Sequence, residues 1–386
     1  MQIPAAFQPP PRLLMGPGPS NVAPSVLQAM SRPLVGHLDP AFVGMMEEIK
    51  TMLREVFQTR NEMTFPVSGT GSAGMEFCLV NLIEPGDEVV IGVNGVFGTR
   101  MVDVAERCGA RVIKVEATWG RIIEPQQIAD TLKQSRPKLV AVVHAETSTG
   151  ALTPVEEISR LAHNAGALFM LDTVTSLGGC AVKIDDWQVD AVYSGTQKCL
   201  SCPPGLAPVS FSKQAVEVAN RRKTKVQSWY LDVNLLGSYW GQDRVYHHTA
   251  PITMNYALHE ALRLVLEEGL ERRWQRHRTN HEALKAGLAK LGLQLAAQEG
   301  HRLWQLNTVT VPEGIDEASV RKRLLSDFNI EVGAGLGPLK GKIWRVGLMG
   351  ETSTRENVKA FLRALSQLLK ESGKRVDVEA VLAAAS

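Results

Sequence analysis

The chain has 386 residues, 44% of them hydrophobic and 21% charged, and its 42 basic and 40 acidic side chains leave a formal net charge of +2. This balance gives no electrostatic footprint for nucleic acid or an anionic membrane, and the composition excludes a disordered or collagen-like chain. Five cysteines are an odd and sparse number, so a disulfide framework is not expected. The start of the chain lacks the charged and apolar regions of a secretory signal, and we therefore expect a cytoplasmic protein.

The N-terminal part is predicted to contain an extended segment and then a helix. Residues 1–20 are rich in proline, which prevents a helix and favours an extended course over a surface. In "FVGMMEEIKTMLREVFQ" the side chains of Met45, Ile49, Leu53 and Val56 recur at helical spacing, which predicts an amphipathic helix.

From Met63 to about Phe211 the pattern is typical of an α/β domain. Short apolar runs alternate with helical patterns such as "VEEISRLAHNAG". Several runs are apolar at both odd and even positions, as in strands that are covered on both faces. This alternation predicts a mainly parallel central sheet. The runs are "MTFPV", "EVVIGV", "RVIKVE", "LVAVVHA", "ALFMLD", "AVYSG" and "LAPVSFS".

The C-terminal part is predicted to form a smaller α+β domain. One long helix is expected from roughly residue 254 to 291, and "LWQLNTVTVP", "IEVGAG" and "KIWRVGLMG" are expected strands between further helices. The charged tail "KESGKRVDVEA" is expected to be a solvated end. We predict an extended segment over 1–20, a large domain over 21–260 and a small C-terminal domain over 261–386.

A glycine-rich turn matches the dinucleotide fingerprint, with Gly69, Gly71 and Gly74 spaced as G-x-G-x-x-G after an apolar run. That fingerprint needs an acidic residue at the end of the next strand, about twenty residues on. Glu88 has the approximate spacing but lies before the apolar run and not after it. An NAD-dependent dehydrogenase is therefore kept only as an alternative from a different class.

The same turn can instead form a phosphate cradle. Free amides at a helix N-terminus and small residues that allow close approach bind an anionic phosphate, here at Thr70, Gly71 and Ser72. Asp172 ends one buried run, and Lys198 follows the next, so both face the crevice where open α/β sheets bind ligands. Pyridoxal phosphate needs a phosphate site, a carboxylate against its ring nitrogen and a Schiff-base lysine, and these three features together predict that cofactor.

Eight segments resemble the class V aminotransferases of fold type I, with alanine–glyoxylate and serine–pyruvate aminotransferases as the nearest kin. The resemblance runs in order from about residue 12 to 370. It implies a large domain with a mainly parallel central sheet, a smaller C-terminal α+β domain and a homodimer with shared active sites. The segments are "LLMGPGPSNV", "VSGTGSAGMEF", "EPGDEVVIGVNGVFG", "HAETSTG", "LDTVTSLGG", "YSGTQK", "RVYHHTAP" and "IWRVGLMG".

The resemblance also implies a role for each matching residue. Lys198 carries the cofactor and moves protons, and Asp172 is the partner of the ring nitrogen. The other cofactor contacts are Phe97 stacked on the ring, Thr147 near the ring hydroxyl, Thr70, Gly71, Ser72 and Gln197 in the phosphate cup, and Tyr246 and Thr249 at the phosphate of the neighbouring subunit. Phe97, Thr147 and Ser72 replace a tryptophan, a serine and a histidine of the animal enzymes.

Arg345 is expected to bind the substrate α-carboxylate. It stands in an otherwise apolar run, where an unpaired guanidinium is costly and where a planar fork suits a carboxylate. The implied reaction is ping-pong transamination from a small L-amino acid, alanine or serine, to glyoxylate or pyruvate. Ureidoglycine–glyoxylate and 3-hydroxykynurenine aminotransferases remain alternatives.

No metal site is predicted. Cys199 and Cys202 form a CxxC pair without a second pair of ligands, so we expect them to be packed in the core. His277 and His281 are four residues apart but lack the glutamate of the zincin motif, and a solvated helix face is expected for them.

Overall fold

Seven of the predicted apolar runs form one sheet in the computed structural model, which describes residues 1–386. In space the strands follow the order β2, β10, β9, β8, β5, β3, β4, and β10 is antiparallel to both of its neighbours while the other pairs are parallel. The mainly parallel sheet is thereby confirmed. The strands are β2 (Met63–Ser68), β3 (Glu88–Val93), β4 (Arg111–Glu116), β5 (Leu139–Val143), β8 (Leu168–Asp172), β9 (Ala191–Tyr193) and β10 (Leu206–Phe211).

Apolar cores cover both faces of this sheet. In β5, Leu139, Ala141 and Val143 belong to one core, and Val140 and Val142 belong to the other, because successive side chains of a strand point to opposite faces. The surrounding helices are α1 (Pro24–Met30), α2 (Pro40–Phe57), α3 (Gly71–Leu82), α4 (Val96–Arg107), α5 (Pro125–Gln134), α6 (Val155–Asn164), α7 (Lys213–Asn220), α8 (Val233–Trp240) and α9 (Ile252–Glu268).

The topology does not suit the dinucleotide fingerprint. The glycine-rich turn joins β2 to α3, but β2 lies at one edge of the sheet and β3 lies near the other. In a dinucleotide-binding unit the helix connects neighbouring parallel strands. The turn therefore lacks the sheet order of a dinucleotide site.

The expected long helix over 254–291 is wrong in one respect, since Gly269 divides it into α9 and α10 (Leu270–Lys290). Gly269 has a φ of 83°, which is a left-handed conformation that glycine adopts without a steric penalty. Helix α9 packs against α1 and α2, whereas α10 packs against the C-terminal helices. The predicted domain limit at residue 260 falls inside α9, and the domain division stays a prediction.

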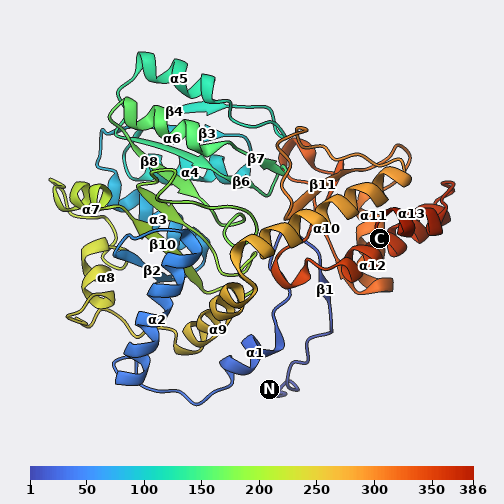
Figure 1. Ribbon diagram of the computed structural model, residues 1–386, viewed down its shortest axis with the longest axis horizontal. Helices are drawn as coiled ribbons and strands as arrows, with labels where there is room; N and C mark the ends of the chain where they lie inside the picture. The colour runs from blue at the N-terminus through green and yellow to red at the C-terminus, as the bar shows by residue number, and fades with distance from the viewer.

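The C-terminal part lies to one side of the central sheet (Figure 1). It has its own core, in which the indole of Trp344 is buried. A three-stranded sheet is formed by β11 (Leu306–Thr310), β14 (Ile343–Gly347) and β13 (Gly333–Ala334), with α10, α11 (Glu317–Phe328) and α12 (Arg355–Glu371) beside it. The expected strand "IEVGAG" is split into β12 (Ile330–Glu331) and β13.

The expected solvated tail agrees with the structure, since none of residues 370–380 is buried. Residues at the end of the chain form α13 (Val378–Ala384), which packs on α10 and α12. The Val381 side chain, directly after this tail, is fully buried in the C-terminal core and anchors the helix there.

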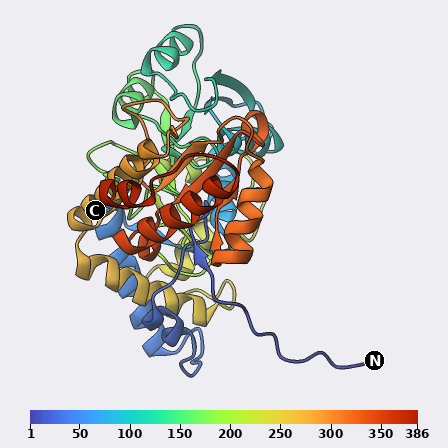
Figure 2. The ribbon, with the colours of Figure 1, turned by 90° about the vertical axis from the view of Figure 1, so that its right-hand side faces the viewer.

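The N-terminal segment extends away from the body of the molecule before it enters the fold (Figure 2). Its first regular element is β1 (Leu13–Leu14), which pairs with β12 and thereby fixes the following residues beside the C-terminal part. None of the helices combines the length and the apolarity needed to cross a bilayer.

Candidate active site

Five of the eleven predicted site residues come from the carboxyl ends of four neighbouring strands, Gln197 among them. Phe97 follows β3, Thr147 follows β5, Asp172 is the last residue of β8, and Lys198 follows β9. These strands lie side by side in the order β9, β8, β5, β3. Since the carboxyl ends of parallel strands meet at one edge of a sheet, the topology gathers residues that are far apart in the sequence.

The Asp172 carboxylate is buried and held by two donors. It is 3% exposed, and it accepts hydrogen bonds from the Val174 amide (2.8 Å) and the Tyr193 hydroxyl (2.5 Å). Burial raises the pKa of Asp172 to about 6, although both hydrogen bonds act to lower it. The sequence reasoning did not assign a role to Tyr193, even though it lies in the quoted run "AVYSG".

The Lys198 amine lies under the N-terminal segment. Its side chain is 8% exposed and donates a hydrogen bond to the Pro17 carbonyl. A Cβ on Gly18 would lie 2.6 Å from the Lys198 Nζ, and Gly18 has a φ of 109°, so only glycine fits there. Burial lowers the pKa of Lys198 to about 8, with the nearby Arg345 guanidinium acting in the same direction.

The predicted phosphate cup lies at the start of α3. Thr70 is the N-cap residue and makes no side-chain cap, and the amides of Gly71 and Ser72 find no acceptor in the chain. A Cβ on Gly71 would meet Val174 at 3.3 Å, which places the helix start against the loop after β8. The Gln197 Oε1 atom is buried without a partner, so this side chain has an unused acceptor.

The Arg345 guanidinium is buried without an acidic partner. It is 8% exposed on β14 and donates to the carbonyls of Ala334 (2.6 Å) and Thr147 (3.3 Å). Burial lowers the pKa of Arg345, and the charge of Glu146 opposes this shift. A structural ion pair is therefore not what holds this arginine, and its fork can accept a carboxylate.

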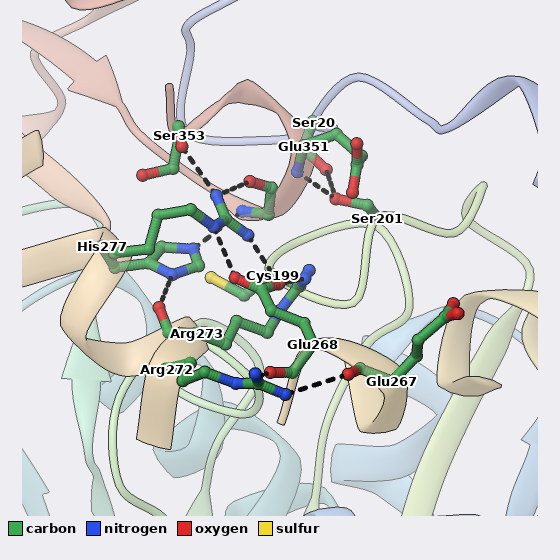
Figure 3. A network of polar contacts seen from close by, with 12 residues as sticks. Ser20, Cys199, Ser201, Glu267, Glu268, Arg272, Arg273, His277, Glu351 and Ser353 are labelled. Carbon is green, nitrogen blue, oxygen red and sulfur yellow. Dashed lines mark hydrogen bonds and ion pairs between the residues drawn. The ribbon is translucent and has the colours of Figure 1, made fainter. Parts of the chain in front are cut away.

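Helix α10 connects the loop after β9 to the turn after β14 (Figure 3). The Arg273 side chain, 2% exposed, donates to the Cys199 carbonyl (2.7 Å) and to Glu268 (2.5 Å). Glu268 also accepts from Arg276, which donates to the Ser353 carbonyl (2.6 Å). The loop carries Lys198, and the turn follows the strand that carries Arg345. These contacts therefore fix the position of the loop relative to that strand.

The expectation of a solvated face for His277 and His281 is wrong. His277 is fully buried, accepts a hydrogen bond from the Gly350 amide (2.9 Å) and faces the Arg273 carbonyl through Nδ1 (Figure 3). His281 is 3% exposed and lies 2.6 Å from Asn307 Oδ1. Both imidazoles are used in packing because α10 lies between the two parts of the fold.

The cysteines beside Lys198 are packed as expected. Cys199 and Cys202 are 0% and 1% exposed, and burial raises the pKa of each thiol to about 12. Cys199 Sγ lies 3.3 Å from the Thr175 carbonyl. Such thiols are unreactive at neutral pH.

Tyr246 and Thr249 do not join the other residues in this chain. Both are exposed, and the Tyr246 ring, at 61%, lies 5.4 Å from the ring of His37 between centroids. The same loop reaches the start of the cup through His248, whose Nε2 lies 2.7 Å from Ser68 Oγ.

The residues present fit pyridoxal phosphate. The free amides at the start of α3 are donors suited to a phosphate, a buried carboxylate ends β8, and Lys198 supplies a buried amine. Phe97 is half-buried at the second position of α4, and the Arg100 guanidinium lies over its ring at 5.1 Å from the centroid. The amine of Lys198 lies close enough to two other charged groups for each to shift its pKa. The Asp172 carboxylate raises this pKa, and the Arg345 guanidinium lowers it.

Comparisons with known proteins place the chain in a family. The profile of the family described as Aminotransferase class-V matches residues 13–361. The chain is 43% identical to (S)-ureidoglycine–glyoxylate transaminase of Bacillus subtilis, over 97% of this chain and 94% of that protein. It is 42% identical to alanine–glyoxylate aminotransferase of Rattus norvegicus, over 95% and 89%. The crystal structure of alanine–glyoxylate aminotransferase from Nostoc sp. superposes with a TM-score of 0.94 at 52% identity, covering 96% of this chain and 98% of that one.

Proposed function

The chain belongs to the class-V aminotransferase family, which depends on pyridoxal phosphate, and we propose that it moves an amino group from a small L-amino acid, alanine or serine, to glyoxylate or pyruvate. The observation that carries this proposal is a buried trio: Lys198 and Asp172 at one end of the central sheet, and Arg345, which reaches from β14 to the Thr147 carbonyl. An amine, a carboxylate and an unpaired guanidinium are the groups that an amino-acid transamination requires.

Each of the three has a separate task. When bound, pyridoxal phosphate supplies an aldehyde for amines and a ring that withdraws electrons from the substrate Cα. Lys198, with a pKa of about 8, is neutral in a useful fraction near neutral pH and can carry a proton between two carbon atoms. Asp172 accepts a hydrogen bond from a protonated ring nitrogen, and Arg345 holds the substrate carboxylate in its planar fork.

Glyoxylate as the acceptor is supported by the relatives of both kinds, since each of their names contains it. The donor divides them, because (S)-ureidoglycine is the donor in the name of a relative that is 43% identical. Ureidoglycine therefore stays a second candidate donor. A matrix of amino acids against keto acids, with ureidoglycine and 3-hydroxykynurenine among the donors, decides between them.

We also propose a homodimer with shared sites. Tyr246 and Thr249 are exposed here, so their proposed contact with the cofactor phosphate requires a neighbouring subunit. Exposed apolar side chains such as Trp229 (63%) and Val245 (55%) lie on the same segment and are suited to burial in an interface. The extended N-terminal segment would then lie over the partner.

The shared-site proposal is tested by complementation. A Lys198→Ala chain and a Tyr246→Phe, Thr249→Ala chain are inactive or impaired alone, and mixing them is expected to restore one intact site per heterodimer. A fully active monomer at assay concentration contradicts the proposal.

We further place the enzyme in the cytoplasm, since its five cysteines are free thiols, as is usual in a reducing compartment.

The test of the function as a whole is spectroscopic. The purified protein supplied with pyridoxal phosphate is expected to show a visible band that borohydride abolishes, and alanine is expected to bleach the band with release of pyruvate. A protein that takes up no cofactor, or that keeps the band with every amino acid tested, contradicts the proposal.

A further inference from the structure

Glu146 is a buried carboxylate that the proposed reaction does not use. It is fully buried at the end of β6 (Ala145–Glu146), a short strand that pairs with β7 (Ala151–Leu152). Burial raises the pKa of Glu146, and hydrogen bonds offset this only in part. A buried carboxylate is costly unless its oxygen atoms are well satisfied, so its contacts indicate what it does.

The Glu146 carboxylate caps the helix that carries the predicted stacking residue. Its Oε2 accepts from the amides of Phe97 (3.1 Å) and Gly98 (3.4 Å), and its Oε1 accepts from the amide (3.1 Å) and hydroxyl (2.5 Å) of Ser148. The Ser148 hydroxyl in turn accepts from the Val96 amide at 3.0 Å. The carboxylate and the serine together satisfy the first turn of α4, where orphan amides need acceptors.

The helix cannot supply this cap itself. Its N-cap residue is Gly95, which has no side chain, and a Cβ there would overlap with both Glu146 and Ser148. Glycine at this position thus lets a carboxylate from a different strand approach the helix start. The position of the Phe97 backbone follows from the position of Glu146.

The same residue begins the turn that carries Thr147 and that contacts Arg345. The Glu146 carbonyl accepts from the amides of Thr149 (3.2 Å) and Gly150 (2.8 Å), which closes the turn around Thr147. The Thr147 carbonyl accepts from the Arg345 guanidinium. One residue therefore connects the elements that carry the ring-stacking, ring-hydroxyl and carboxylate-binding candidates.

We propose that Glu146 is a positioning residue that fixes the Phe97 ring against the cofactor by capping α4, and that it acts on cofactor binding through Phe97. The inference rests on the proposed function, in which Phe97 stacks on pyridoxal phosphate. Its role differs from that of a general stabiliser, because its effect on the cofactor depends on the side chain at position 97.

A double-mutant cycle tests this dependence. In Glu146→Gln one amide oxygen replaces two carboxylate oxygens, so the new NH₂ group faces either the Phe97 amide or the Ser148 donors. We expect the dissociation constant of pyridoxal phosphate to rise about tenfold, with a weaker visible circular dichroism band from the bound cofactor. In a Phe97→Leu background the same substitution is expected to have an effect at least about threefold smaller. Glu116→Gln, at an exposed glutamate at the end of β4, is the matched control and should bind like the unaltered protein.

Equal effects of Glu146→Gln in both backgrounds overturn the proposal, since they are what a merely structural role gives. An unchanged dissociation constant with an unchanged dichroism band overturns it too. If Glu146→Gln does not fold, Ser148→Ala keeps the carboxylate and removes the acceptor of Val96 and the 2.5 Å bond. For Ser148→Ala we then expect the same dependence of cofactor affinity on Phe97. An equal effect with and without Phe97→Leu again contradicts the proposal. Failure of the unaltered protein to take up pyridoxal phosphate is a different result, which contradicts the proposed function itself.

Discussion

The Tyr193 hydroxyl donates a 2.5 Å hydrogen bond to the Asp172 carboxylate, and the two residues end neighbouring strands of the sheet. Both side chains are buried, and the bond favours the charged form of the carboxyl group while burial favours the neutral form. Tyr193 thus influences the charge state of Asp172, the proposed partner of the ring nitrogen. Tyr193 itself has no proposed contact with the cofactor.

Replacing Tyr193 by phenylalanine is expected to raise the pKa of Asp172 above its present value of about 6, because a bond that stabilises the charged form is lost. A hydrogen bond to a charged group contributes about 1.5–3 kcal/mol, so cofactor affinity at pH 7 should fall about tenfold or more. The loss of affinity at acid pH should begin at a higher pH than in the unaltered protein.

The measurement is the dissociation constant of pyridoxal phosphate between about pH 5 and about pH 9. Tyr256→Phe is the control, since that hydroxyl donates to the Pro33 carbonyl at the surface. An identical pH profile for Tyr193→Phe would show that the bond does not tune the carboxylate.

Asp172→Asn is expected to abolish most of the activity and yet to stabilise the cofactor-free protein. The folded-state pKa of Asp172 is raised from 3.8 to about 6, so its contribution to stability is present below pH 3.8 and is lost as the pH rises through about 6. Two pKa units correspond to about 3 kcal/mol, which the neutral amide should recover above pH 6.

Denaturant unfolding of both cofactor-free proteins at low and at neutral pH checks this expectation. The asparagine variant should be more stable at neutral pH, and the difference should shrink toward pH 4. A variant that is less stable at neutral pH, or that keeps near-normal turnover, contradicts the role given to Asp172.

Gly18→Ala is expected to impair cofactor capture with little effect on the rest of the fold. The added methyl group would lie within 2.6–2.9 Å of the Lys198 side chain, and the φ of 109° is unfavourable for alanine. We expect slower attachment of pyridoxal phosphate, measured as growth of the visible band after mixing. Gly36→Ala is the control, since a Cβ there meets nothing within 4 Å. Equal rates for the two variants would mean that the N-terminal segment does not restrict the amine.

Arg345→Ala should weaken the amino donor and the keto acid alike, because both carry one carboxylate. Truncating one member of a desolvated charge pair costs about 2–5 kcal/mol, which corresponds to about two to three orders of magnitude in kcat/KM. Arg345→Lys should recover only part of this, since an ammonium cannot form the bidentate fork. Single-turnover measurement of each half-reaction is the check. Loss of one substrate alone would indicate a second carboxylate anchor, and loss of the cofactor would make Arg345 structural.

Local patterns predicted the strands and the ends at which the site lies. The run that ends at Asp172 is apolar at both odd and even positions because β8 is covered on both faces. That pattern is visible in the sequence alone. The place of Lys198 near the end of a strand was predicted in the same way, from the apolar run that forms β9.

Non-local contacts account for what sequence reasoning missed. The capping role of Glu146 depends on the amide of Phe97, 49 positions away, and the burial of His277 depends on the turn at Gly350, 73 positions away. Neither contact leaves a periodic signal near the residue itself. The quoted motifs "HAETSTG" and "AVYSG" contained Glu146 and Tyr193, so the motifs marked the right segments without marking these side chains.

The central claim is that Lys198 carries the cofactor, and one measurement tests it most directly. The protein loaded with pyridoxal phosphate is reduced with borohydride and digested, and the labelled peptide is sequenced by mass spectrometry. We predict a single pyridoxyl group on Lys198, in the peptide that contains "YSGTQK". A pyridoxyl group on any other lysine, or none after full loading, would contradict it.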